Sequence, residues 1–290
     1  MVPPPAVNID IRRQFFAEEI AAIANLRTPR LVAALAAIPR ERFLPPGPWI
    51  VQSEQGSARP TPDADVAHVY HNYSVAIDPA RQLFNGAPGF VCGLMDAMAL
   101  REGARVLHVG AGLGYYSAML AHVVGPSGDV LAVEVDHALA QAAADALAGM
   151  HWVTVAAGDA GDIVSDGFDA IFVSAGVTHP PAAWLDALAD GGRLLLPLTA
   201  TIPAMGPIGK GVVLLITRRS AGVFDARVMT FVAISSAIGL RDDAINEQLG
   251  KAMMRTPFPR LRGLRRDAHE PGAACWLHGD GFCLELAGGR

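Results

Sequence analysis

The chain has 290 residues, 51% of them apolar, and its 28 acidic and 23 basic residues give a net charge of −5. This composition excludes a wholly disordered chain and argues against a surface devoted to nucleic acid. Apolar residues at helical spacing occur over 10–40, where Thr28 is expected to cap a helix that begins at Pro29. Residues 44–65 are rich in proline and glycine and predict an irregular connector. We expect 1–95 to form a helical segment and a cap on the substrate side.

Alternating strands and helices begin near residue 100 and predict an α/β fold. Buried strands are expected at 105–110, 130–135, 153–159, 168–176, 193–198 and 211–219, with helices at 115–124, 137–150 and 180–192. Strands that are apolar throughout are typical of parallel sheets covered on both faces. We therefore expect a doubly wound, mostly parallel, Rossmann-like sheet over 96–235. Residues 236–290 are expected to be an extension with one helix and a loop-like tail.

The segment VLHVGAGLGYYSAMLA carries the clearest functional pattern, because a predicted strand ends in the turn GAGLG at 110–114 and a helix follows at once. It is not the dinucleotide fingerprint, since Tyr115 stands where the third glycine would lie, and no Gly-Lys-Ser/Thr of a P-loop follows. A ligand without a pyrophosphate, such as S-adenosylmethionine, also needs a turn without side chains.

Two acidic residues end the next two predicted strands. Glu134 can accept hydrogen bonds from the ribose hydroxyls of a nucleoside, and Asp159 can accept one from an adenine amino group. In the alternative reading, the glycines serve only helix packing and both acids are solvated. Turn and acids fall together at the carboxyl ends of consecutive strands, where open α/β sheets bind ligands, so we predict S-adenosylmethionine as the cofactor.

From about residue 30 to 235 the sequence resembles the protein-L-isoaspartate O-methyltransferases, which are class I S-adenosylmethionine-dependent methyltransferases. The matching segments are, in order, LVAALAAIPRERFLP, RVLHVGAGLGYYSAMLA, VLAVEVD, GDAGD with FDAIFVSAGV, and GGRLLLPL. The resemblance implies that 211–219 and the following segment RVMTFVAI pair antiparallel at one edge of the sheet. It also implies cofactor contacts from Gly110, Ala111, Gly112, Gly114, Glu134, Val135, Asp159 and Ala160.

The sequence departs from the family in the segment before the first strand. The family carries a Thr-Ile-Ser-Ala/Gln-Pro signature, whereas residues 81–88 read RQLFNGAP and place Asn85 or Gly86 at the serine position. A carboxylate acceptor needs no general base, so Arg81 and Asn85 are the candidate positioning residues. For a hydroxyl or amine acceptor, His71 or His179 is the candidate base. The expected pocket walls besides the 81–88 turn are Tyr70, His71, Tyr73, Thr178 and His179.

Three functions follow from these patterns. The first is methyl transfer to a peptide or protein carboxylate, as the resemblance implies. The second is methyl transfer to a small-molecule or natural-product acceptor, and the third is cofactor binding without catalysis. Neither a membrane nor a nucleic acid is an expected partner, and nothing indicates the oligomeric state. An odd cysteine count and an N-terminal segment without an apolar core favour the cytoplasm.

The C-terminal tail holds two further clusters. Five arginines between 255 and 266 are expected to form a solvated or interface surface. His269, Cys275, His278 and Cys283 are zinc-ligand types, but their spacing matches no usual zinc-finger pattern. Because apolar residues surround them, we expect a tail packed on the domain and predict no metal site.

Overall fold

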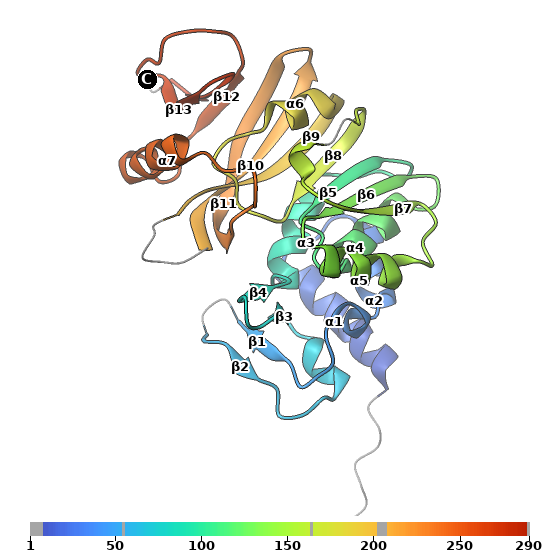
Figure 1. Cartoon of the computed structure of the whole chain (residues 1–290). Coiled ribbons are helices and arrows are strands. Elements are labelled where there is room, and N and C mark those ends of the chain that lie inside the picture. Colours follow the sequence, from blue (N-terminus) through green and yellow to red (C-terminus); the bar gives the residue numbers. More distant parts are fainter. Residues whose placement is uncertain (1–7, 54–55, 163–164, 202–207, 289–290) are drawn as a thin grey trace, which may run out of the picture.

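The computed structural model describes residues 8–53, 56–162, 165–201 and 208–288. A ten-stranded sheet forms its centre (Figure 1). In spatial order the strands are β13 (Cys275–Gly279), β14 (Phe282–Leu286), β12 (Leu261–Arg265), β11 (Val223–Ser235), β10 (Ile208–Ser220), β9 (Leu188–Ala200), β8 (Phe168–Val173), β5 (Arg105–Val109), β6 (Asp129–Glu134) and β7 (Val153–Ala157). The five strands from β9 to β7 are parallel, and the pairs on the other side of β9 are antiparallel.

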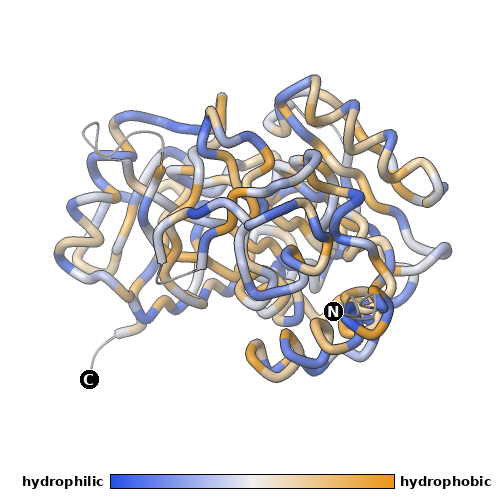
Figure 2. Tube along the Cα trace, turned by 90° about the horizontal axis from the view of Figure 1, so that it is seen from below, coloured by the Kyte–Doolittle hydropathy of each residue, from blue (hydrophilic) through white to orange (hydrophobic). Residues whose placement is uncertain are grey.

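Helices cover both faces of this sheet, which confirms the doubly wound fold. One face packs against α1 (Ile9–Ile23), α2 (Pro29–Ala37), α3 (Pro88–Ala97), α4 (Tyr115–Val124) and α5 (His137–Leu147). The other packs against α6 (Ala182–Ala187) and α7 (Asp243–Arg255). Successive side chains of one strand pack on opposite faces of the sheet, as those of Val106 and Leu107 in β5 do. The two ends of the described chain lie on opposite sides of the molecule (Figures 1 and 2).

A second, small sheet lies beside the central one. Its order is β2 (Arg59–Pro60), β1 (Ile50–Gln52), β3 (Ser74–Asp78) and β4 (Leu83–Phe84). The short 3-10 helices η1 (Arg40–Phe43) and η2 (Val66–Val69) flank β1 and β2 in the chain, and η3 (Ala160–Asp162) follows β7. The connector expected at 44–65 is therefore not irregular throughout, because it supplies both β1 and β2.

Three expectations about the elements need correction. The helix expected at 180–192 ends at Ala187, because β9 begins at Leu188 and runs through the glycines with a register shift against β8. The strand pair β10–β11 is antiparallel as expected, but β11 is not an edge. The tail expected to be loop-like forms β12, β13 and β14, which extend the sheet beyond β11.

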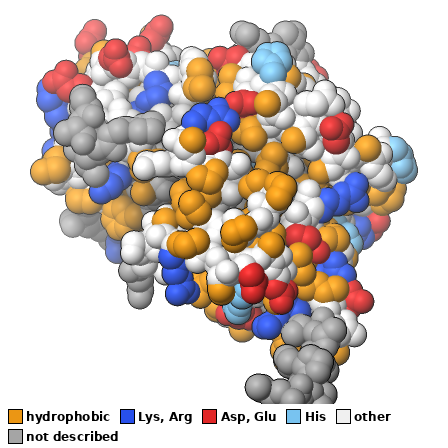
Figure 3. All heavy atoms as spheres, turned by 60° about the horizontal axis from the view of Figure 1, so that its bottom comes forward, with side chains coloured by type: hydrophobic (Ala, Val, Ile, Leu, Met, Phe, Trp, Pro, Cys, Tyr) orange, Lys and Arg blue, Asp and Glu red, His pale blue; other side chains and the backbone are white. Residues whose placement is uncertain are grey.

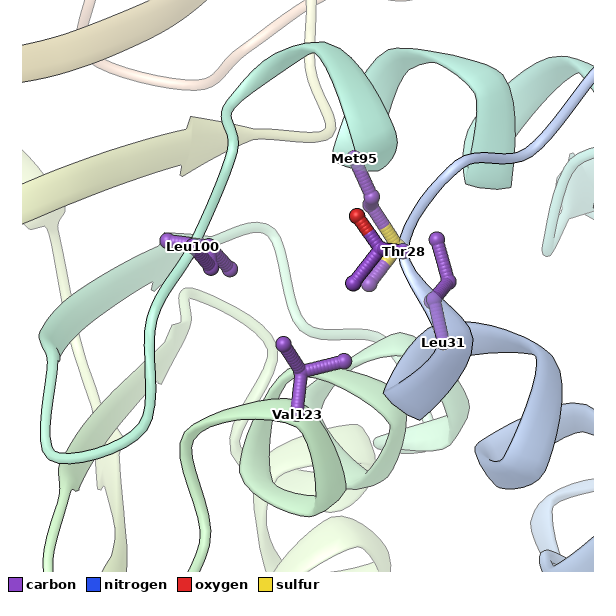
Figure 4. Close-up of a pocket in the computed structure, with 5 residues that line it drawn as sticks. All are labelled: Thr28, Leu31, Met95, Leu100 and Val123. Atoms are coloured by element: carbon purple, nitrogen blue, oxygen red, sulfur yellow. The ribbon is translucent and has the colours of Figure 1, made fainter.

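The surface shows no segregation of charge on the face in Figure 3, where acidic and basic side chains are interspersed around a central group of hydrophobic ones. None of the described helices is long and apolar enough to cross a membrane. A void of about 10 Å³ lies among Thr28, Leu31, Met95, Leu100 and Val123 (Figure 4). It is a packing gap between α2, α3 and α4, too small for a ligand.

Candidate cofactor and acceptor site

A cavity of about 1310 Å³ opens at the carboxyl ends of the parallel strands. The turn after β5, the end of β6 and the residues after β7 and β8 line one part of it. Residues 81–87 and 230–238 line another part, and residues of the small sheet, such as Gln52 and Ile77, also contribute. In the sheet, β5 lies between β6, which follows it in the chain, and β8, which comes later in the chain. The cavity therefore lies at the topological switch point, where open α/β sheets bind ligands.

The glycine turn forms the floor of the cavity. The amides of Gly110 and Ala111 both donate to the Val133 carbonyl, at 2.9 and 3.1 Å, and fix the turn to β6. Gly112 has a φ of +55°, and a Cβ there would lie 3.1 Å from Cδ1 of Ile77. The turn needs glycine at this position for both reasons, and it leaves a bare backbone surface that fits a nucleoside-containing cofactor.

Glu134 is held in place by the loops on either side of it. Its Oε2 accepts a hydrogen bond from the Gly112 amide at 2.8 Å, and its Oε1 accepts one from the Asp136 amide at 3.1 Å. The residue is 7% exposed and lines the cavity, as do Val135 and Asp136. A carboxylate fixed in this way offers its remaining lone pairs to hydroxyl donors without reorganising.

Asp159 and Ala160 line the far end of the cofactor part of the cavity. The Oδ1 atom of Asp159 accepts a hydrogen bond from the Gly161 amide at 2.8 Å. Gly239 packs directly against the other oxygen, since a Cβ there would lie 2.0 Å from Oδ2, and its φ is +80°. The segment after β11 thus closes against Asp159, a contact that the sequence pattern did not indicate.

Two further cavity residues, His108 and Ser174, were missed at the sequence level. His108 Nε2 lies 3.0 Å from Ser174 Oγ, and its Nδ1 lies 2.8 Å from the buried Ser117 Oγ. Burial lowers the pKa of His108 to about 3, so the imidazole is neutral near pH 7. A histidine between the apolar residues Leu107 and Val109 of the strand was the available signal.

Asn85 lines the cavity together with the rest of residues 81–87. Its Oδ1 accepts hydrogen bonds from the Val75 amide at 3.0 Å and from Nη2 of Arg40 at 3.3 Å. Its Nδ2 is buried and has no hydrogen-bond partner within the described parts of the chain. Both N–H donors of this amide are therefore available.

Arg40 is fully buried behind Asn85. Its guanidinium donates to the carbonyls of Val69, His71 and Tyr73 at 2.8, 3.1 and 2.6 Å. It makes no ion pair with any carboxylate that the structure describes, so backbone carbonyls and the Asn85 amide oxygen are its hydrogen-bond acceptors. The sequence pattern did not indicate this role for Arg40, because the carbonyls that it binds lie about 30 residues further along the chain.

Arg81 lies on the rim of the cavity, half exposed, between two carboxylates. Its Nε donates to Asp78 at 2.7 Å and its Nη1 to Asp136 at 2.5 Å. The pKa of Asp136 is lowered by the Leu139 amide and then by Arg81. The arginine thus links the β3–β4 turn to the start of α5.

The structure corrects the expected pocket walls, because five of the predicted residues lie outside the cavity lining. Tyr70 is 1% exposed and its hydroxyl donates to Glu41. The His71 and Tyr73 carbonyls bind Arg40. The segment that contains these three residues holds the arginine rather than facing a ligand.

The other two predicted wall residues serve the C-terminal extension. Thr178 is fully buried, and its Oγ1 accepts a hydrogen bond from the Asp242 amide at 3.0 Å, next to the start of α7. The His179 ring stacks on Phe282 at a centroid distance of 6.1 Å. Burial lowers the pKa of both His71 and His179, but neither histidine reaches the cavity.

Comparisons with known proteins agree with this geometry. The family model for protein-L-isoaspartate(D-aspartate) O-methyltransferase (PCMT) matches residues 62–207. A protein-L-isoaspartate O-methyltransferase 1 of Rhodopseudomonas palustris (strain HaA2) is 34% identical over 193 residues, covering 65% of this chain and 69% of its own. A protein-L-isoaspartate O-methyltransferase of Methylorubrum extorquens (strain PA1) is 31% identical over 224 residues, covering 75% and 86%.

Two solved structures share the fold. A protein-L-isoaspartate O-methyltransferase superposes with a TM-score of 0.63 at 20% identity, covering 87% of this chain and 73% of its own. A chain described as a beta-aspartate methyltransferase from Plasmodium falciparum, in complex with S-adenosyl-L-homocysteine, superposes with a TM-score of 0.59 at 16% identity. That match covers 77% of this chain and 97% of its own.

Proposed function

Since the chain belongs to the protein-L-isoaspartate(D-aspartate) O-methyltransferase family and is an S-adenosylmethionine-dependent methyltransferase, we propose that its acceptor is a peptide carboxylate of the isoaspartyl type. The relatives are named for this acceptor, and the site supports an anionic one. The observation that carries the proposal is the buried, unpartnered Nδ2 donor of Asn85, whose Oδ1 accepts a hydrogen bond from the buried guanidinium of Arg40.

The cofactor supplies a methyl group on a positively charged sulfur. The residues expected to hold it are the glycine turn, Glu134 at the ribose and Asp159 near the adenine. Attack by a carboxylate neutralises both charges as the new bond forms, so no proton has to be moved. A partly buried surrounding favours such a step, because ionic reactants lose more solvation than the less charged transition state. The His108 imidazole is neutral and hydrogen-bonded to two serines, so it adds no charge to the site.

Asn85 and Arg40 recognise the acceptor together in this proposal. The Asn85 Nδ2 donates to a carboxylate oxygen, and the Arg40 charge, acting through the Oδ1 that it binds, favours an anion at that place. With Asn85 or Gly86 at the position of the family's serine, an amide hydrogen-bonded to a cation takes over the role of the missing hydroxyl in this proposal. In the same proposal, residues 1–95 form the acceptor-side cap, 96–235 bind the cofactor, and 236–290 form an extension.

Arg81 is proposed as a second positioning residue on the rim. Two of its nitrogens are engaged by Asp78 and Asp136, and the structure records no bond from its Nη2 to a described residue. That nitrogen is free to donate to an incoming carboxylate. Because the neighbouring acids already neutralise much of its charge, its contribution should be smaller than that of Asn85.

The test is methyl transfer from labelled cofactor to a pair of peptides that differ only in one residue, L-isoaspartyl in one and L-aspartyl in the other. We expect base-labile, volatile label with the isoaspartyl peptide and little with its aspartyl twin. Label that appears only with small-molecule carboxylates or alcohols would overturn the isoaspartyl proposal. Cofactor binding without turnover on any acceptor would instead indicate a protein that has lost catalysis.

A further inference from the structure

The structure brings four side chains of the C-terminal extension together, although their spacing in the sequence predicted no metal site. The ligand atoms of His269, Cys275, His278 and Cys283 all lie within 4.8 Å of one another. Cys275 Sγ lies 3.5 Å from His269 Nε2, 4.0 Å from His278 Nδ1 and 2.7 Å from Cys283 Sγ. The sulfur separation exceeds that of a disulfide bond, about 2.05 Å.

An irregularity in strand pairing explains how the residues of β13 and β14 meet. His278 pairs directly with Cys283, and Cys275 pairs with Glu285, with a register shift between Cys275 and Leu277. Cys283 and Glu285 are two residues apart and share a face of β14. Residues three apart in a regular strand point to opposite faces of the sheet. The register shift therefore places Cys275 on the same face as His278.

The fourth residue, His269, lies in the loop between β12 and β13, and its ring has the orientation of a metal ligand. His269 Nδ1 lies 2.8 Å from the carbonyl of Asp267. Because a carbonyl only accepts, Nδ1 carries a proton, and in the neutral ring the lone pair is then on Nε2, the nitrogen that faces Cys275. A protein carbonyl that fixes the second imidazole nitrogen in this way is typical of histidines that bind metals.

We propose that these four residues bind one zinc ion that fastens the 266–274 loop to the β13–β14 hairpin. Two thiolates and two imidazoles are the donor set of a structural zinc site, with about 2.3 Å to sulfur and 2.0–2.1 Å to nitrogen. The nearby Glu285 is not a ligand, because Arg262 and Arg265 bind its carboxylate at 2.8 and 3.2 Å. This site lies outside the methyltransferase cavity and does not depend on the proposed acceptor.

Metal analysis of the full chain, purified under reducing conditions from zinc-supplemented cells, tests the proposal. We expect one zinc per chain by elemental analysis and native mass spectrometry. Cobalt substitution should give the visible bands of a tetrahedral site and a thiolate-to-cobalt charge-transfer band. In competition with a chromophoric chelator, His269→Ala should weaken zinc binding by roughly 100-fold or more.

Matched variants separate this site from adventitious metal. His151→Ala changes an exposed histidine elsewhere, and Cys92→Ala changes the one cysteine outside the cluster, so both should keep the zinc. His269 is partly exposed in a loop, so its variant should stay folded and remain informative even if Cys283→Ser does not. A metal-free chain, zinc retained by the Cys275→Ser/Cys283→Ser double variant, or a disulfide between these cysteines in the reduced preparation would overturn the proposal.

Discussion

Glu134 connects the two loops that are proposed to hold the cofactor. Replacing it with glutamine removes the charge and turns one oxygen into a donor that faces the Gly112 or Asp136 amide. We expect Glu134→Gln to weaken S-adenosylhomocysteine binding by about 10- to 100-fold, since a hydrogen bond to a charged group contributes ~1.5–3 kcal/mol. Isothermal titration calorimetry measures this directly.

Asp129→Asn is the matched control, because Asp129 lies at the opposite end of the same strand and pairs with Arg105 at 3.1 Å. Its affinity for S-adenosylhomocysteine should equal that of the unmodified chain. Equal weakening in both variants would mean that Glu134 acts through strand stability and not through the cofactor.

Asn85→Asp tests acceptor recognition while keeping the shape of the side chain. The Oδ1 contacts to Val75 and Arg40 can persist, but the Nδ2 donor becomes a second carboxylate oxygen that repels an anionic acceptor. Turnover on an isoaspartyl peptide should fall by about 10- to 100-fold, equivalent to ~1.4–2.7 kcal/mol, with cofactor affinity unchanged. Arg81→Ala should produce a smaller loss.

The control for this substitution is Asn72→Asp, since Asn72 also accepts a main-chain hydrogen bond, from Gly89 at 2.8 Å, but lies outside the cavity. Steady-state kinetics on the three proteins provide the comparison. An Asn85→Asp enzyme as active as the Asn72→Asp enzyme would contradict the proposed donor.

At the scale of elements, β9 and β10 approach so closely that one position accepts no side chain. A Cβ on Gly211 would lie 1.9 Å from the Leu198 carbonyl oxygen, within the pairing of Gly211 with Thr199. Gly211→Ala should therefore lower the free energy of unfolding by about 1–3 kcal/mol or more. Urea denaturation measures the change.

Gly250 in α7 provides the opposite case. A Cβ there meets no atom within 4 Å, so Gly250→Ala should raise the free energy of unfolding by about 0.5–1 kcal/mol through helix propensity. Destabilisation by both substitutions would show that the contact with Leu198 is not the cause at Gly211.

The sequence predicted the elements whose patterns are strong and local. The helix expected at 115–124 is observed with those bounds, because a glycine turn opens it and apolar residues fill it. The strands β12, β13 and β14 were missed, since each has five residues with few β-branched side chains, and β12 meets β11 through the single pair Phe224 and Leu264. Pairing partners distant in the chain decide such segments.

The same contrast applies to the site. Residues 110–113, Glu134 and Asp159 line one cavity, and a local motif was sufficient to place them together. Gly114, also predicted to contact the cofactor, lies outside the cavity lining, because it packs against Ala143 and Leu147 of α5. The acceptor side was not predictable in this way, because Arg40 reaches Asn85 across 45 residues and draws the Tyr70–Tyr73 segment away from the cavity. No spacing rule connects a buried arginine with the carbonyls that it will bind.

The stability of the whole molecule should depend on pH through His108. The ordinary histidine pKa of 6.5 applies to the unfolded chain, whereas burial lowers the folded value to about 3. Between these values only the unfolded chain binds the proton, so the free energy of unfolding falls as the pH falls through this window. The expected slope is on the order of 1 kcal/mol per pH unit.

His108→Gln removes the titration and keeps a polar side chain between Ser117 and Ser174. Urea denaturation at about pH 7 and about pH 5.5 should show a smaller loss of stability in this variant than in the unmodified chain. Other titrating groups contribute equally to both proteins, so their difference isolates His108. An identical pH dependence would show that this imidazole already accepts a proton in the folded state.

The two main-chain hydrogen bonds of Glu134 also bear on how quickly the cofactor can bind. They tie the glycine turn to the start of α5 through the protein's own groups, so the turn does not have to order itself on encounter. Association should accordingly follow a single exponential whose rate constant rises linearly with ligand concentration, without the plateau that a slow loop closure imposes. The conformational entropy of the turn is then lost during folding and not during binding. Ordering of the turn therefore takes nothing from the free energy of the contacts with the cofactor, and this free energy sets how long the cofactor stays bound.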